Sequence, residues 1–141
     1  MPISDGLGVK FVAGFGPIVK APQESRKFYA DLIGLPLKPM DNDPDYFQVE
    51  ALDGVKHFAL WPLASAAESC FGAAAWPSNV PEPNAWLEFD VEDVGVASAA
   101  LKAKGCQLLV DNRKEPWGQI VSRLLSPEGI LIGITFTPWL R

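Results

Sequence analysis

The stretch VKAPQESRKFYADLIGLPLKPM, residues 19–40, decides the fold, because its plan returns in VEDVGVASAALKAKGCQLLV, residues 91–110. In each stretch a valine leads into a helical segment, a glycine ends that segment, and an apolar run follows. The two glycines, Gly34 and Gly105, stand where the end of a helix favours a residue in the left-handed conformation. A plan used twice in one chain predicts two similar structural units, which we call module 1 and module 2.

The composition predicts a single globular domain over residues 1–141, because 48% of the residues are hydrophobic and 21% are charged. The net charge of −5 and the lack of clustered Lys and Arg argue against nucleic acid as a partner. No apolar run approaches the roughly 18 residues of a membrane span, and residues 1–10 lack the order of a secretion signal. We therefore expect a cytoplasmic protein without a membrane partner.

Module 1 is expected over about residues 9–63. Its helix has an apolar side formed by Phe28, Leu32 and Ile33, with Tyr29 beside them, and this side is expected to pack on a sheet. The expected elements are a strand at 10–20, a helix at 22–33, an apolar run at 35–40, and strands at 45–52 and 55–63 joined by the turn signal Asp53-Gly54.

Module 2 is expected over about residues 84–137, and residues 64–83 form a linker between the modules. The linker is long for a loop without secondary structure, so we expect it to cross the molecule or to contribute to binding. Its aromatic residues Phe71 and Trp76 either cap a binding groove or cover a dimer seam. The expected elements of module 2 are a strand at 84–91, a helix with Val94, Ala97 and Leu101 inward, and strands at 107–110, 119–125 and 130–137.

Five motifs follow one another in a characteristic order: Phe28-Tyr29-Ala-Asp-Leu-Ile-Gly34, Val91-Glu-Asp-Val94, Ala100-Leu-Lys-Ala-Lys-Gly105, Glu115-Pro-Trp-Gly118 and Ser126-Pro-Glu-Gly129. In this order the chain resembles the vicinal oxygen chelate superfamily, in its glyoxalase and bleomycin-resistance branch. The resemblance implies an α+β fold in which two βαβββ modules form a cupped mixed sheet around a pocket. It also implies a homodimer, and the sequence leaves open whether the modules close within one chain or exchange between chains.

Metal-using members of that superfamily are expected to carry ligands on the first, fourth, fifth and eighth strands, facing the cavity. By motif spacing these positions fall at Gly14, Ala59, Trp86 and Gly133, none of which can bind a metal. A register shift of one or two residues brings in only His57 or Glu88, which leaves the coordination shell incomplete. We therefore predict no metal and no cofactor.

The tryptophans are candidate ligand-binding residues, because indole faces stack on planar molecules and contribute about 1 kcal/mol each beyond the area they bury. Trp61 and Trp86 fall on cavity-facing positions of their strands, and Trp117 lies in a loop that borders the binding groove in bleomycin-resistance-like proteins. Gly14, Gly16 and Gly133 are expected to add room. The alternative is that some tryptophans belong to the core, and Trp139 is expected to be structural.

Polar residues on the same faces leave two questions open. Glu88 shares a face with Trp86, and a carboxylate in an apolar groove requires a partner, which is either a cationic group of the ligand or Arg123. His57, the single histidine, either contacts the ligand or acts as a base, or it is a residue at the start of a strand near solvent. Cys70 and Cys106 have no basic neighbour in sequence that would favour a thiolate.

Two functions remain. The preferred one is a non-catalytic, metal-free protein that confers antibiotic resistance by sequestering a bulky aromatic and cationic drug or a related metabolite. The alternative is an enzyme of the superfamily, such as a metal-dependent lyase or isomerase, a dioxygenase or a thiol transferase, or one that uses His57 and Glu88 as acid–base groups. No catalytic residue is assigned in the preferred reading, and the candidate ligand-binding residues are Trp61, Trp86, Glu88, Trp117, His57, Arg123 and Gly133.

Overall fold

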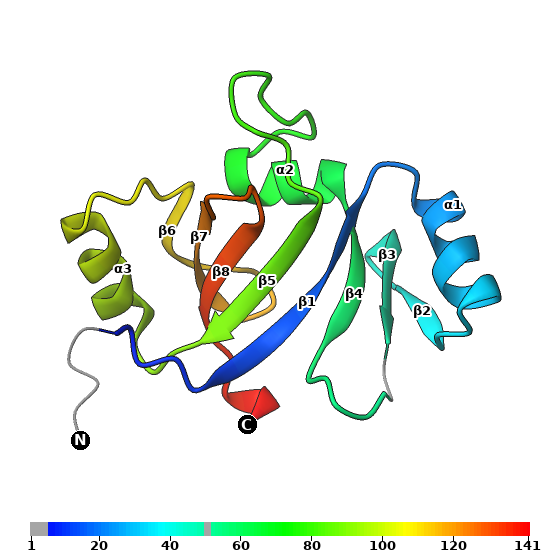
Figure 1. Cartoon of the computed structure of the whole chain (residues 1–141), viewed down its shortest axis with the longest axis horizontal. Helices are drawn as coiled ribbons and strands as arrows, with labels where there is room; N and C mark the ends of the chain where they lie inside the picture. The colour runs from blue at the N-terminus through cyan, green and yellow to red at the C-terminus, as the bar shows by residue number, and fades with distance from the viewer. Residues whose placement is uncertain (1–5, 50–51) are drawn as a thin grey trace.

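A single mixed sheet organises the protein, and the computed structural model describes residues 6–49 and 52–141 (Figure 1). In chain order the elements are β1 (Phe11–Val19), α1 (Pro22–Arg26), η1 (Lys27–Leu32), β2 (Leu37–Met40), β3 (Asp43–Val49), β4 (Phe58–Pro62), α2 (Leu63–Phe71), β5 (Ala85–Asp90), α3 (Val94–Ala103), β6 (Val110–Lys114), β7 (Ile120–Leu125), β8 (Leu131–Phe136) and η2 (Pro138–Leu140). The eight strands lie in the order β2-β3-β4-β1-β5-β8-β7-β6.

The two modules meet where β1 pairs antiparallel with β5, from Phe11 opposite Asp90 to Pro17 opposite Ala85. Within each module the first strand pairs in parallel with the last, β1 with β4 and β5 with β8. The expected α+β fold with two βαβββ modules in one cupped sheet is confirmed. The modules pair within one chain, which the sequence left open.

The repeated stretch behaves as expected at the ends of its helices. Gly34 and Gly105 both have positive φ, 93° and 90°, a conformation that other residues adopt at a cost. Asp93 begins α3 by accepting a hydrogen bond from the backbone N–H of Val96 at 3.0 Å. Each helix is therefore delimited by local chemistry that the sequence contains.

The expected packing of the first helix is wrong. After α1 the chain continues as the π-helix η1, in which the N–H of Ile33 donates to the carbonyl of Phe28 at 3.0 Å. This wider turn breaks the regular α-helical period, so Phe28, Leu32 and Ile33 are 49%, 74% and 56% exposed. Tyr29 alone of the four packs on the sheet, against the cluster that contains Phe47.

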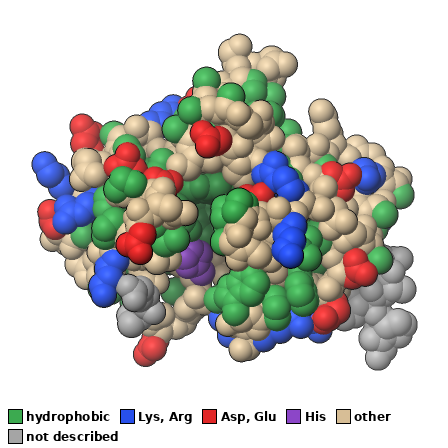
Figure 2. Space-filling model, turned by 180° about the vertical axis from the view of Figure 1, so that it is seen from behind, with side chains coloured by type: hydrophobic (Ala, Val, Ile, Leu, Met, Phe, Trp, Pro, Cys, Tyr) green, Lys and Arg blue, Asp and Glu red, His purple; other side chains and the backbone are tan. Residues whose placement is uncertain are grey.

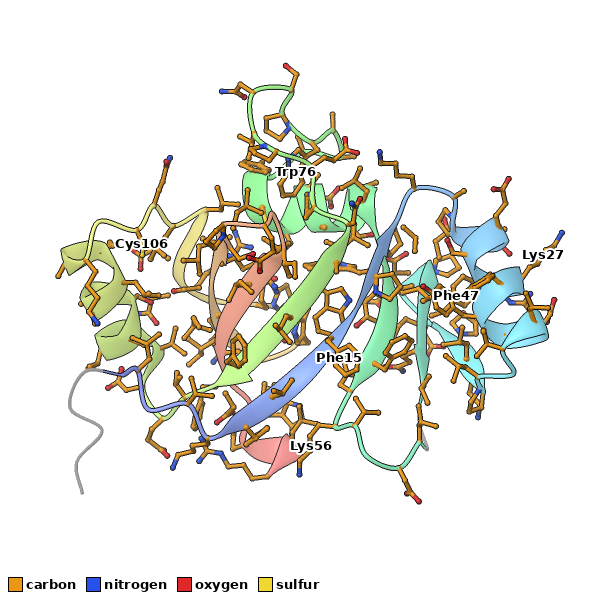
Figure 3. All side chains as sticks on the ribbon, in the orientation of Figure 1. Phe15, Lys27, Phe47, Lys56, Trp76 and Cys106 are labelled. Atoms are coloured by element: carbon orange, nitrogen blue, oxygen red, sulfur yellow. The ribbon has the colours of Figure 1, made fainter. Side chains whose placement is uncertain are left out.

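The outer face of the sheet is only partly covered. The helices α1 and α3 lie at its two ends, and β1 and β5 pass between them (Figure 1). Phe47 lies under the first helix and is buried, whereas Phe15 on β1 is 43% exposed (Figure 3). The expected homodimer stays a prediction.

The linker contains a helix that the sequence analysis did not expect. The helix α2 begins at Leu63, buries Ala66, Ala67 and Cys70, and ends at Gly72 with a φ of 76°. The loop after α2 is held by Trp76, whose indole N–H donates to the carbonyls of Val80 and Pro81 (Figure 3). The segment 64–83 was expected to be one loop because of its three prolines, but Pro77, Pro81 and Pro83 all follow α2, and the Ala-rich part before them is free to form a helix.

Several strand boundaries also differ from expectation, since β3 begins at Asp43 instead of 45 and β4 at Phe58 instead of 55. The strand β6 begins at Val110, where the expected strand 107–110 ends, and Gly118 lies in the turn that returns to β7. The end of the expected strand 45–52 includes residues 50 and 51, which lie outside the described residues. In the part of the chain that the structure describes, no helix is long and apolar enough to cross a membrane.

Gly16 provides a test of the sheet. A Cβ at this position would lie 2.0 Å from the carbonyl oxygen of Ala59, a backbone atom that the strand pairing holds in place. We expect Gly16→Ala to lower the free energy of unfolding by about 3 kcal/mol, as strong overpacking does. Chemical denaturation measures this change.

The matched control is Gly95→Ala in α3, where a new Cβ would meet no backbone atom and would lie 3.3 Å from Asn112 Nδ2 and 3.4 Å from Asp93 Oδ1, both at the ends of side chains. The free energy of unfolding should change there by less than about 1 kcal/mol. Equal effects of the two substitutions would contradict the packing described for Gly16.

Candidate functional site

A cleft of about 1080 Å³ opens on the face of the molecule seen in Figure 2. Its lining comes from strands of both modules, from α2, from the turn between β6 and β7, and from the segment after β8 that contains η2. The one histidine of the sequence, His57, lies in this hollow (Figure 2). The cleft therefore collects residues from both modules and from the linker.

The indole of Trp86 forms the floor of the cleft. It lies over two glycines of β1, since a Cβ on Gly14 would be 2.9 Å from Trp86 Cη2 and a Cβ on Gly16 would be 3.1 Å from Trp86 Nε1. The indole N–H donates to the carbonyl of Ala59 on β4 at 3.1 Å. The expectation that Gly14 and Gly16 add room for a ligand is therefore wrong, because Trp86 fills that room.

The side chain of Glu88 fills the space next to Gly133, as Trp86 fills the space next to Gly14 and Gly16. A Cβ on Gly133 would lie 2.7 Å from Glu88 Cγ, so the glutamate side chain covers the glycine. Gly133 is absent from the lining of the cleft for this reason. Its expected contact with a ligand has no geometric support, and its role is to leave space for Glu88.

Glu88 is bound on both carboxylate oxygens by other residues of the chain. Arg123, which is 2% exposed, donates from Nη1 to one oxygen at 3.0 Å, and Gln119 donates to the other at 3.1 Å. The alternative that Glu88 pairs with Arg123 is confirmed. A buried ion pair of this kind is stable only when further hydrogen bonds compensate the loss of water.

Arg123 and Gln119, which bind Glu88, also contact two of the tryptophans of the cleft. The guanidinium carbon of Arg123 lies 4.8 Å from the centre of the Trp61 ring, which is a cation–π contact. At the other end, the indole N–H of Trp117 donates to Gln119 Oε1 at 2.8 Å. Trp61 and Trp117 are thus connected through a chain of charged and polar side chains.

His57 has a partner that the sequence did not reveal. Its Nε2 lies 2.8 Å from the hydroxyl oxygen of Tyr46, and the two rings are stacked with their centres 6.3 Å apart. Its ring also lies 5.8 Å from that of Trp86. His57 is therefore a half-buried residue in a defined contact with Tyr46.

Burial determines the protonation of this pair. It lowers the pKa of His57 below its usual 6.5, and the negative charge of Glu88 opposes this effect. Burial also raises the pKa of Tyr46, and Glu88 adds to that increase. At neutral pH both side chains are uncharged, so they present a neutral hydrogen-bonding pair to the cleft.

The tryptophans divide into two groups. Trp61 and Trp86 are buried and meet edge to face, with ring centres 6.3 Å apart, so they form the floor. Trp117 and Trp139 line the cleft and are each 58% exposed. Trp139, which was expected to be structural, is thus part of the cleft wall and not of the core, and a role in binding stays a prediction.

The helix α2 closes one end of the cleft and is attached to both modules. Ser65 donates to Asp43 at 2.7 Å in module 1, and Arg113 donates to the carbonyl of Ser69 in module 2. Arg113 also pairs with the buried Glu115 at 2.6 Å. The linker therefore lines part of the cleft, and the expectation that it contributes to binding stays a prediction.

Sequence reasoning did not assign several residues of the site, among them Tyr46, Gln119 and Trp139. Tyr46 could have been found, because alternation along β3 places it on the same face as Gln48, and both line the cleft. Gln119 lies between the turn at Gly118 and the start of β7, and no sequence motif marks it as a site residue. Trp139 depends on contacts between residues far apart in the sequence.

The residues at the expected metal-ligand positions do not fit a metal ion. Trp86 and Glu88 occupy the space next to Gly14 and Gly133, and Glu88 is already paired with Arg123. Among residues 6–49 and 52–141, no three His, Cys, Asp or Glu side chains lie together as a possible metal site. The expected absence of a metal in the protein stays a prediction, which elemental analysis tests.

A cupped sheet of two βαβββ modules with a cleft on one face defines the class of protein. The chain belongs to the Glyoxalase/Bleomycin resistance protein/Dioxygenase superfamily, whose model matches residues 15–134. The family that the sequence motifs resembled is thus confirmed. No curated protein matches the chain in sequence.

Solved structures share the fold at low sequence identity. A superfamily member from Vibrio splendidus is 17% identical, with 90% of this chain and 98% of that chain covered and a TM-score of 0.59. Methylmalonyl-CoA epimerase from Streptomyces coelicolor, in complex with 2-nitronate-propionyl-CoA, is 15% identical, with 92% and 96% covered and a TM-score of 0.56. A structure described as NAD-dependent benzaldehyde dehydrogenase from Legionella pneumophila is 17% identical, with 87% and 96% covered and a TM-score of 0.54.

These structures correct one expectation. We expected a non-catalytic protein, because the metal donors of the fold are replaced in this chain. The similar structures include an epimerase and a chain described as a dehydrogenase, so the fold does not support that conclusion. The cytoplasmic location stays a prediction.

The burial of His57 predicts a lowered pKa for its imidazole. Because His57 is the single histidine of the sequence, its resonances can be assigned directly. NMR titration of the imidazole resonances should give a pKa below 6.5, because burial disfavours the charged ring. Glu88→Gln should lower this pKa further, since the charge of Glu88 stabilises the imidazolium form. Asp31→Asn on η1, away from the cleft lining, should leave it unchanged. A pKa at or above 6.5 would disprove the burial of His57.

Proposed function

We propose that the cleft binds a small organic molecule that has a planar apolar part and one polar group. The observation that carries this proposal is the combination of two exposed indoles, Trp117 and Trp139, with the neutral pair His57 and Tyr46 deeper in the same cleft. Exposed indoles in a concave site favour planar ligands. A neutral pair can both donate and accept a hydrogen bond, which suits a carbonyl, hydroxyl or amide group.

The size of the cleft supports a bulky ligand. Its volume of about 1080 Å³ lies just above the range of roughly 300–1,000 Å³ that is usual for small-molecule sites. An antibiotic or a metabolite of similar size agrees with this volume. A positive charge on the ligand is not part of the proposal, because Arg123 and Gln119 already bind both oxygens of Glu88.

A second candidate is proton-transfer chemistry on the bound molecule. A neutral His57 can accept a proton, and Glu88 stabilises the imidazolium that results. The hydroxyl of Tyr46 lies 2.8 Å from Nε2 and orients the imidazole. When Nε2–H donates to the Tyr46 oxygen, Nδ1 is the nitrogen that accepts the proton, and the imidazolium returns that proton from Nδ1. The reaction class that this geometry supports is acid–base catalysis by His57, with no step through a metal.

Intrinsic fluorescence tests binding. A panel of planar antibiotics and aromatic metabolites should contain compounds that quench tryptophan emission, and Trp117→Phe should weaken the binding of such a compound about three- to tenfold. Trp76→Phe is the matched control, because Trp76 packs on Phe71 outside the main cleft and its loss should not change the affinity. Quenching that depends on Trp76 and not on Trp117 would contradict the proposed site.

Turnover tests the second candidate. Each compound that binds is incubated with the protein, and its proton NMR spectrum is followed for exchange or conversion. For a compound that reacts, His57→Ala should reduce the rate about 10²–10⁴-fold, as loss of a general base does, and binding should persist. Unchanged turnover in His57→Ala would exclude His57 as the base and leave the binding proposal intact.

A further inference from the structure

The segment after β8 forms one wall of the cleft. The residues Thr137, Trp139 and Leu140 line it, and the short helix η2 lies at the end of the molecule opposite to α2 (Figure 1). Trp139 is 58% exposed, so burial does little to hold its side chain in place. The position of this wall therefore depends on how the backbone of the segment is attached.

Asp90 attaches it. This residue ends β5 and is 0% exposed, and a carboxylate so deeply buried requires hydrogen-bond donors. One oxygen accepts the backbone N–H of Thr137 at 2.8 Å and its hydroxyl at 2.7 Å. The other oxygen accepts Nη2 of Arg141 at 2.8 Å. All these donors belong to the segment that carries Trp139.

Arg141, which follows η2, makes further contacts besides its hydrogen bond to Asp90. Its Nη1 donates to Glu92 at 3.1 Å, and its guanidinium carbon lies 5.2 Å from the centre of the Phe136 ring. The residues 137 and 141 are thus both bound to Asp90, and η2 with Trp139 lies between them. Neither Asp90 nor Arg141 lines the cleft.

We propose that Asp90 and Arg141 are positioning residues that hold Trp139 as a wall of the cleft and so limit the size of the ligand that fits. A guanidinium bridges Asp90 and Glu92 with two parallel donors, which an ammonium group does not do. The effect on ligand size rests on the proposed binding function, whereas the position of Trp139 is independent of it. The experiment separates the two.

Fluorine NMR of fluorotryptophan-labelled protein reports each indole separately, and Trp139→Phe identifies the Trp139 signal. In Arg141→Ala the Trp139 signal should move toward the position of free fluorotryptophan and become narrower, while the Trp76 signal stays unchanged. Arg141→Lys should give a smaller shift, since it keeps the charge and loses the bridge. A general loss of stability would instead move all signals together.

The matched control is Arg26→Ala, which removes another arginine that lies over a phenylalanine ring, 5.9 Å from the centre of Phe47. The Trp139 signal should not move in this variant. An unmoved Trp139 signal in a folded Arg141→Ala protein would overturn the proposal. The side chain of Arg141 is 31% exposed, so we expect the Arg141 variants to fold, whereas a substitution of the fully buried Asp90 risks unfolding the protein.

The second measurement is the affinity of the Arg141→Ala variant for ligands of different size. For a compound that quenches tryptophan emission in the wild-type protein, Arg141→Ala should reduce the affinity about three- to tenfold, and larger analogues of that compound should lose less. Equal losses for small and large analogues would overturn the size limit. If no compound binds the wild-type protein, the binding function fails, and the fluorine signal still decides whether Arg141 positions Trp139.

Discussion

The cleft and the joint between the two modules both depend on the indole of Trp86. This side chain starts on β5, crosses β1 over Gly14 and Gly16, and donates to the carbonyl of Ala59 on β4. A single residue of module 2 is thereby bonded to a strand of module 1. The crossing is possible only because the strand between them carries glycine, since any Cβ there would meet the indole or the neighbouring backbone.

The charges of the cleft follow from the same arrangement. With Trp86 and Trp61 as an apolar floor, Arg123 is buried and Glu88 is largely removed from water, so the two charges compensate each other, and Gln119 supplies a further donor. Their compensation leaves His57 and Tyr46 as the neutral polar pair above the floor. The cleft thus combines an apolar base, a neutral hydrogen-bonding pair and exposed indoles, which is a suitable surface for an organic molecule.

Local signals in the sequence account for the parts of this structure that were predicted. The helix ends at Gly34 and Gly105 and the alternation that turns Trp86 and Glu88 to one face are properties of neighbouring residues. Contacts between distant residues account for most of what was missed: Trp86 fills the space above Gly14, and Asp90 attaches Trp139 through Thr137 and Arg141. The π-helix η1 was missed because an extra residue in one turn leaves no mark in the apolar pattern.

The most direct test of the role of Trp86 is a measurement of nuclear Overhauser effects between its indole ring and the α-protons of β1. Strong effects to Gly14 and Gly16, together with slow solvent exchange of the Trp86 indole N–H, are the predicted result, because the ring lies on both glycines and its N–H is bonded to Ala59. Absent effects to both glycines and rapid exchange would show that the indole does not cross β1, and the floor of the cleft described above would be wrong.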